Sequence, residues 1–215
     1  RAASGTLLSN LVPRWNTTNL TVSPGFSSAN SSYNLTVANS VSSITVFPTL
    51  AETNSSAAAR VGSGNFTVIA AGKASSALAL SPGANTVQVR VLSDDKTTSR
   101  TYSLGVSRLT APVANSAGVV TLNGTTLSGT IDARSVSAAF QIGATSSFGT
   151  SLPLSFVGGN GTASVSTSTG ALQASTLYYF RLTSQYGGIT DNGTTGTFLT
   201  PVRTELASIF RTGGN

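Results

Sequence analysis

Apolar and polar residues alternate with a period of two along much of this chain. Tyr33, Leu35 and Val37 would share one face of a strand, with Asn34 and Thr36 on the other face. The same alternation, bounded by turn signals such as Ser81-Pro82-Gly83, predicts further strands at 43–47, 65–69, 77–80, 86–92 and 100–106. Short strands that recur every ten or so residues are typical of an antiparallel β-sandwich.

The second half of the chain continues this pattern with new strands and glycine-containing turns. The predicted strands are 119–122, 126–132, 138–142, 163–168, 178–183 and 196–200. The length allows two ordinary domains. The sequence therefore predicts an all-β fold with two tandem immunoglobulin-like antiparallel β-sandwiches.

The expected organisation has four parts. They are an N-terminal segment (1–18), a first sandwich (19–108), a second sandwich (109–201) and a C-terminal tail (202–215). Strand pairing should end near Val106, and Pro112 restricts Ala111 to extended conformations. Because no glycine run separates the sandwiches, we expect a short, stiff linker.

Both terminal segments carry apolar side chains that a finished sandwich does not require. Pro13 lacks an N–H group, so a central strand should not continue beyond it. Each segment either packs against its own sandwich or completes a sheet in another copy of the chain; the C-terminal one could be a short helix or a strand. The candidate subunit-contact residues are Leu7, Leu8, Leu11, Val12, Val202, Leu206, Ile209 and Phe210.

Several stretches of the first half resemble the bacterial cadherin-like β-sandwich domain. They include Asn19-Leu20-Thr21-Val22-Ser23-Pro24-Gly25, Ser32-Tyr33-Asn34-Leu35-Thr36-Val37, Val41-Ser42-Ser43-Ile44-Thr45-Val46-Phe47-Pro48-Thr49, Leu80-Ser81-Pro82-Gly83-Ala84-Asn85-Thr86-Val87 and Thr101-Tyr102-Ser103-Leu104-Gly105-Val106-Ser107-Arg108. The resemblance covers about 19–108. It implies a spacer or adhesive unit of a large secreted protein, and no enzyme activity.

The second half, about 112–201, resembles a fibronectin type III domain. Leu172 and Thr176-Leu177-Tyr178-Tyr179-Phe180-Arg181-Leu182 are similar to its sixth strand, and residues 140–149 to a central strand and turn. The resemblance implies that Tyr178 is a corner tyrosine, with a buried ring and a hydroxyl bonded to the preceding turn. The early tryptophan typical of the family is missing, since the single tryptophan is Trp15.

The composition points to a protein outside the cell. Charged residues are 8% of the chain, against about 25% in an average soluble protein, so Ser, Thr, Asn and Gly must form most of the surface. The net charge is +6, but the basic residues are scattered, which argues against nucleic-acid binding. No apolar run is long enough for a membrane span. We expect a secreted or cell-surface protein after removal of a signal peptide, or a segment of a longer one.

Candidate catalytic chemistry is sparse. The chain lacks His and Cys, which removes the commonest general base, thiol nucleophiles and zinc-thiolate sites. Asp94 and Asp95 are the adjacent acids, and they fall in a predicted hairpin turn where Asp is ordinary. No carboxylate cluster marks a calcium site near the linker. We therefore predict no enzyme activity, no cofactor and no metal site.

Glycosylation acceptors are the recurrent chemical motif. Nine of the fourteen asparagines stand in Asn-X-Ser/Thr, whereas the Ser and Thr content would give about four by chance. The sequence thus predicts a glycoprotein, with candidate sites at Asn16, Asn19, Asn30, Asn34, Asn54, Asn65, Asn123, Asn160 and Asn192.

Two functional hypotheses follow. The first is a non-catalytic extracellular structural protein, a self-assembling homo-oligomeric subunit of a surface filament, fibre or layer that exchanges a strand or tail with other copies of itself. The alternative is an adhesive or carbohydrate-binding spacer module of a larger secreted protein, with glycans or other cell-surface proteins as partners. Its aromatic platform would come from Trp15, Phe148, Phe156 and Tyr186.

Overall fold

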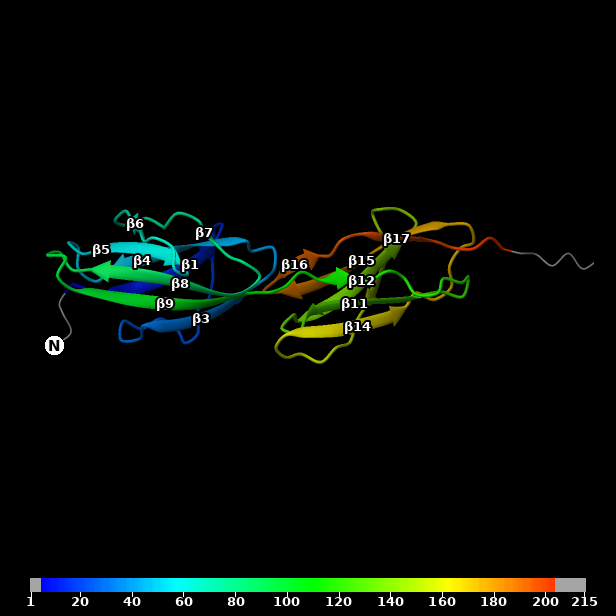
Figure 1. The fold of residues 1–215 in the computed structure, drawn as a ribbon, viewed down its shortest axis with the longest axis horizontal. Helices are drawn as coiled ribbons and strands as arrows, with labels where there is room; N and C mark the ends of the chain where they lie inside the picture. The colour runs from blue at the N-terminus through cyan, green and yellow to red at the C-terminus, as the bar shows by residue number, and fades with distance from the viewer. Residues whose placement is uncertain (1–4, 204–215) are drawn as a thin grey trace, which may run out of the picture. The chain divides into compact units, whose positions relative to one another are not determined.

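The computed structural model describes residues 5–203, which form strands and turns and contain no helix (Figure 1). This part of the chain therefore offers no helix that could cross a membrane. The chain divides into two compact units, Arg1–Ala111 with Tyr186–Asp191 (unit 1) and Pro112–Gln185 with Asn192–Asn215 (unit 2). The all-β fold class predicted from the period-two pattern is confirmed.

Unit 1 contains two facing sheets. One has the order β2-β1-β4-β7, and the other has the order β3-β9-β8-β5-β6. All neighbouring pairs are antiparallel except β3 with β9, which is parallel. The strands are β1 (Leu8–Trp15), β2 (Thr18–Asn19), β3 (Ser32–Val37), β4 (Ser43–Leu50), β5 (Ser56–Val61), β6 (Thr67–Ile69), β7 (Leu78–Ala79), β8 (Gly83–Leu92) and β9 (Ser99–Arg108).

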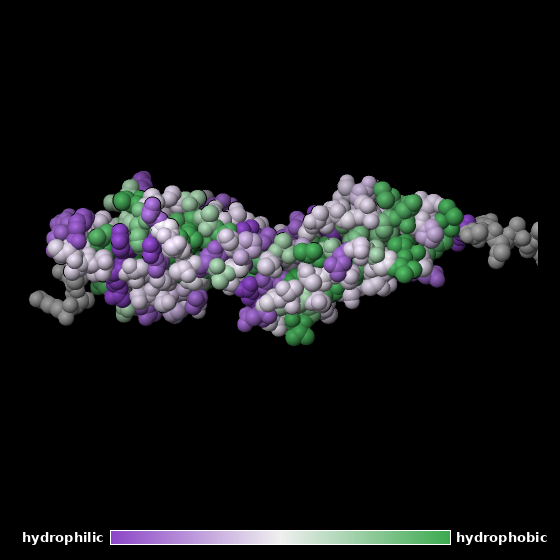
Figure 2. Space-filling model, viewed as in Figure 1, coloured by the Kyte–Doolittle hydropathy of each residue, from purple (hydrophilic) through white to green (hydrophobic). Residues whose placement is uncertain are grey.

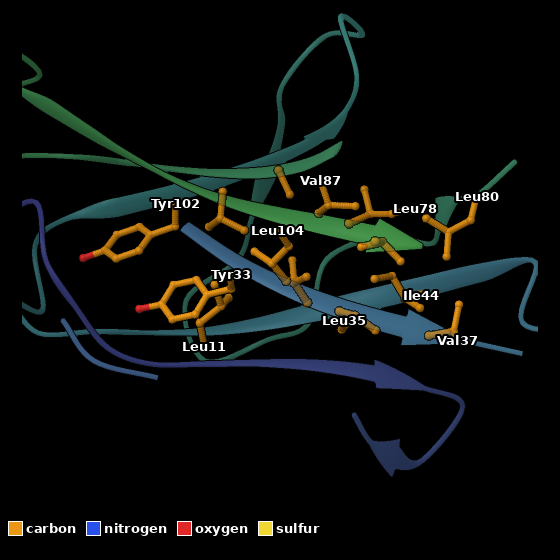
Figure 3. Close-up of a cluster of buried hydrophobic side chains, with 14 of the residues drawn as sticks. Leu11, Tyr33, Leu35, Val37, Ile44, Leu78, Leu80, Val87, Tyr102 and Leu104 are labelled. Carbon is orange, nitrogen blue, oxygen red and sulfur yellow. The ribbon is translucent and has the colours of Figure 1, made fainter. Parts of the chain in front are cut away.

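The core of unit 1 follows the alternation of its strands (Figure 3). Val87, Val89 and Val91 of β8 are fully buried. Val87 pairs with Leu104 of β9 and Val89 with Tyr102, whereas Val89 and Val91 pair on the other side with alanines of β5. Each such side chain contributes roughly 1.5–3 kcal/mol by leaving water. Burial of one face fixes the strand register, because a one-residue slip would expose the whole set.

The N-terminal segment lies inside this sandwich. Leu8 and Leu11 of β1 are buried in the core, and β1 pairs with β4 over most of its length. The strand continues through Pro13, contrary to the expectation from sequence. The reason is that the backbone of Pro13 faces away from β4, where its carbonyl accepts the N–H of Leu20, so the missing N–H removes no β1–β4 hydrogen bond.

Strand β5 is absent from the sequence prediction. Its residues Ala57, Ala58 and Ala59 are all buried, so the stretch shows no period-two alternation. Alanine also has low intrinsic β-propensity. The strand forms because β6 and β8 pair with it from either side, and its small side chains fit between them.

Unit 2 also has two sheets. The first has the order β10-β11-β14, and the second has β13-β12-β15-β16 with β17 paired to β15. Phe140, Phe180 and Leu182 are buried from the second sheet, and Leu127 and Ile131 are buried from the first. The strands are β10 (Val113–Ala114), β11 (Thr126–Asp132), β12 (Ser137–Gly143), β13 (Thr150–Pro153), β14 (Thr162–Ser168), β15 (Leu177–Tyr186), β16 (Ile189–Asn192) and β17 (Gly196–Leu199).

Two expectations for unit 2 have different outcomes. The strand predicted at 119–122 is wrong: an isolated bridge joins Thr121 to Gly124, and Val119 is exposed. The hydrogen bond expected for Tyr178 is present, because its hydroxyl accepts the N–H of Gln173 at 3.2 Å. The ring of Tyr178 is half-buried and stacks on Phe198. The fibronectin type III resemblance itself stays a prediction.

A short segment from the later part of the chain belongs to unit 1. Tyr186 and Ile189 pack against its core. The buried carboxylate of Asp191 accepts the backbone N–H groups of Asn39 and Ser40 at 2.6 and 2.8 Å. Hydrogen bonds to a carboxylate are stronger than those between neutral groups, so Asp191 has a structural role in unit 1.

Candidate subunit-contact groove and surface sites

An apolar groove opens between the two sheets of unit 1, on the side where β4 faces β5 and β6. We name it the β4 groove, and its volume is about 380 Å³. It is lined by Phe47, Pro48, Thr49, Leu50, Thr53, Ala57, Ile69, Ala70, Ala71 and Gly72. Small residues on the β6 side leave room for an apolar side chain from elsewhere. The sequence analysis did not select these residues, because the pairing of β5 with β6 is what brings Ala57 and Ile69 to the groove.

The groove lies along a partly open strand edge. Strand β7 pairs with β4 at Ser43 and Ile44, and Ser75 then bonds both backbone groups of Val46. Farther along, Pro48 is buried and has no N–H to offer. Proline at an exposed edge discourages simple strand addition. The groove can therefore accept side chains of an added segment, whereas Pro48 interrupts a continuous row of backbone hydrogen bonds between such a segment and β4.

The predicted subunit-contact residues fall into two groups. Leu7, Leu8, Leu11 and Val12 lie in or next to β1, where Leu8 and Leu11 are buried in their own unit. This arrangement favours the reading in which the N-terminal segment packs against its own sandwich. Val202 is 71% exposed. Leu206, Ile209 and Phe210 lie outside the described residues.

The four candidate platform aromatics do not gather at one place. Trp15 and Tyr186 pack against the core of unit 1, whereas Phe156 packs against the core of unit 2. The ring centre of Phe148 lies 4.6 Å from the guanidinium carbon of Arg181. All four side chains are half-buried.

A second groove in unit 1 contains one of these aromatics. Its volume is about 460 Å³. Tyr186 lines it together with mostly polar residues, including the two candidate glycosylation residues Asn19 and Asn34. The groove therefore combines an aromatic ring with hydroxyl and amide groups, which is the chemistry that the carbohydrate hypothesis requires.

Two further carboxylates, those of Asp95 and Asp132, have partners within the protein. Asp95 accepts a hydrogen bond from the Ser93 hydroxyl at 2.6 Å and one from the Thr97 N–H at 3.0 Å, which lower the pKa of its carboxyl. Asp132 forms an ion pair with Arg134 at 2.7 Å. Within residues 5–203, no group of three or more acidic side chains could hold a metal ion.

The candidate glycosylation residues share one property: the side chains of all nine lie on the surface. Asn16, Asn19, Asn30, Asn34, Asn54, Asn65, Asn123, Asn160 and Asn192 are each exposed. Residues of intermediate hydropathy cover much of the visible face of each unit (Figure 2). Exposure is required for modification, and the predicted glycans themselves stay a prediction.

The fold defines this chain as an all-β protein of sandwich architecture. Within it, residues 17–109 match the family model described as "Cadherin-like beta sandwich domain", so the first half contains a cadherin-like β-sandwich domain. That confirms the resemblance stated for the first half. No curated protein sequence matches the chain.

Three solved structures show weak similarity. The BSP domain of a biofilm-associated protein is 13% identical with a TM-score of 0.28, and the match covers 79% of this chain and 29% of that chain. The three N-terminal domains of the outer capsid protein Hoc of bacteriophage RB49 are 9% identical with a TM-score of 0.41, and the match covers 91% of this chain and 71% of that chain. The titin fragment A168–169 is 11% identical with a TM-score of 0.34, and the match covers 90% of this chain and 100% of that chain. Similarities of this size carry no argument about function.

Proposed function

We propose that this chain is a non-catalytic structural protein of the cell exterior, a self-assembling subunit of a surface filament, fibre or layer. The C-terminal apolar segment of one copy would bind the β4 groove of the next. The observation that carries the proposal is an open apolar groove in unit 1 of a chain whose exposed Val202 leads into further apolar residues.

The dimensions are compatible with this arrangement. Residues 204–215 would reach about 40 Å when extended, which exceeds the roughly 27 Å length of an eight-residue strand such as β4. A tail that enters a groove on a different surface makes a head-to-tail contact, and such contacts build rings or open filaments. Leu206, Ile209 and Phe210 would supply the side chains for the groove.

Two variants test the proposal from opposite sides. Deletion of residues 204–215 removes the tail and leaves the groove. Ala71→Arg places a long cation at the groove, where Ala71 is exposed, and leaves the tail. Each variant alone should be monomeric by sedimentation velocity. Their mixture should contain heterodimers and nothing larger, because it holds one usable tail and one usable groove per pair.

Ala77→Arg is the matched control, because Ala77 is equally exposed but does not line the groove. This variant should assemble like the unmodified chain. Assemblies that persist unchanged in both the tail deletion and Ala71→Arg would contradict the proposal.

The second candidate function is an adhesive or carbohydrate-binding spacer module of a larger secreted protein. The polar groove that contains Tyr186 favours it. Binding on a glycan array should disappear in Tyr186→Ala and persist in Tyr179→Ala, whose aromatic ring lies outside that groove. Loss in both variants, or in neither, would contradict it.

A further inference from the structure

Two arginines and a phenylalanine form a cluster on the outer face of unit 1. The guanidinium carbons of Arg60 and Arg90 lie 4.3 and 4.2 Å from the ring centre of Phe66. Strand register places Arg60 opposite Gln88, and Arg90 opposite Ala58, all on the face that points away from the core. We name Arg60, Arg90 and Phe66 the arginine cluster.

Within residues 5–203, the two positive charges in the cluster have no ion-pair partner. Both lie near one ring, so they are at most about 9 Å apart, close to the Debye length at physiological salt. In the described part of the chain, the carboxylate engaged in an ion pair is Asp132, with Arg134. Like charges held together without a counter-charge favour an anion from outside.

The donors of the cluster are only partly used by the protein. The Nε of Arg60 donates to the Gln88 side chain at 2.7 Å and its Nη1 to the Gly64 carbonyl at 3.4 Å, which fixes the direction of its guanidinium plane. The side chain of Arg90 makes no hydrogen bond within residues 5–203, and its Nε is buried without an acceptor. Arg90 therefore keeps its terminal N–H groups for a ligand, in the fork geometry that matches a carboxylate.

The surroundings of the cluster point to a sugar polymer rather than to DNA. The cross-strand neighbours on the same face are Thr101 beside Arg90 and Ser103 beside Gln88, so hydroxyl and amide groups flank the two cations. A duplex-binding surface would need a longer row of cations to follow the phosphates. Two cations beside neutral polar groups suit a chain of hydroxyl-rich units that carry carboxylates.

We propose that the arginine cluster binds an acidic polysaccharide, with uronate carboxylates held by Arg60 and Arg90. Phe66 keeps the two guanidinium groups in place through cation–π contacts. This site is independent of subunit assembly, because its residues do not line the β4 groove.

The test measures binding of the full chain to polygalacturonate by affinity gel electrophoresis, with neutral dextran as the reference polymer. Asn65 precedes Phe66 and is a candidate glycosylation residue, so every chain carries Asn65→Gln. The double variant Arg60→Gln/Arg90→Gln should raise the Kd at least about tenfold. Arg14→Gln is the matched control, because Arg14 stacks on Phe47 in the other sheet, and its Kd should change less than twofold.

A second variant covers the case in which the double Gln variant does not fold. Arg60→Lys/Arg90→Lys keeps both charges but removes the planar forks, and it should raise the Kd at least about threefold. The proposal is overturned if this variant binds like the unmodified chain, if Arg14→Gln weakens binding as much as the double variant, or if dextran binds as tightly. It is also overturned if a single-stranded DNA oligonucleotide binds as tightly as polygalacturonate, which would mark the cluster as a general polyanion site.

Discussion

The hydroxyl of Tyr102 accepts a hydrogen bond from the backbone N–H of Leu8 at 3.0 Å, although the two residues lie 94 positions apart in the sequence. Both residues are fully buried. The tyrosines Tyr102 and Tyr33 direct their hydroxyl ends the same way in the core of unit 1 (Figure 3). This bond joins β1 to β9, so it couples the N-terminal segment to the core.

Tyr102→Phe should destabilise unit 1 by about 1–3 kcal/mol, because the buried N–H of Leu8 loses its acceptor. For a unit of this size, each kcal/mol lowers the Tm by roughly 4–8 °C. Thermal unfolding followed by circular dichroism measures the change. Tyr179→Phe is the control, since that hydroxyl has no protein partner in the described part of the chain; an equal loss there would contradict the explanation.

Deletion of residues 1–18 should prevent unit 1 from folding, because it removes β1 with the buried Leu8 and Leu11. Deletion of residues 204–215 leaves every described core residue of unit 1 in place, so the stability of unit 1 should change by less than about 0.5 kcal/mol. Limited proteolysis and hydrogen exchange compare the two truncated chains. A stable unit 1 without residues 1–18 would show that β1 is dispensable. The N-terminal segment would then again be a candidate for strand exchange between copies of the chain.

Gly129→Ala should destabilise unit 2 by about 1–3 kcal/mol through overpacking. A Cβ at Gly129 would overlap the backbone carbonyl of Val113 and approach Leu182 Cδ2 to 2.8 Å. Gly149→Ala is the matched control, because nothing lies within 4 Å of a Cβ there. Calorimetric unfolding should show a lower stability of unit 2 in Gly129→Ala than in Gly149→Ala. Equal stabilities would contradict the close approach of β10 to β11.

Material from the native source should lose mass on enzymatic deglycosylation. The expectation follows from nine candidate asparagines that are all exposed. Intact mass spectrometry before and after enzymatic deglycosylation measures the difference, and peptide mapping assigns the sites. Asn10 is the internal control, because it is also exposed but lacks the acceptor motif. A mass that does not change on deglycosylation would refute glycosylation.

The strands that alternate strictly were predictable from sequence, because burial of one face imposes a period of two. The prediction 126–132 coincides with β11, and the predictions 33–37 and 86–92 lie within β3 and β8. Strand β5 was not predictable, because its three consecutive alanines are all buried between neighbouring strands. The prediction that β1 would not continue beyond Pro13 was wrong because the sequence does not reveal which edge of a strand the missing N–H faces.

The sequence by itself determined that this is an all-β, charge-poor chain with many candidate glycosylation residues. Those properties follow from composition and from local periodicity, which each segment carries on its own. The tertiary structure alone decided that Leu8 and Leu11 belong to the core, that β4 and β6 border a groove, and that Arg60 and Arg90 meet at Phe66. Such relations depend on strand order and register, which are set by long-range pairing and by the packing of two sheets.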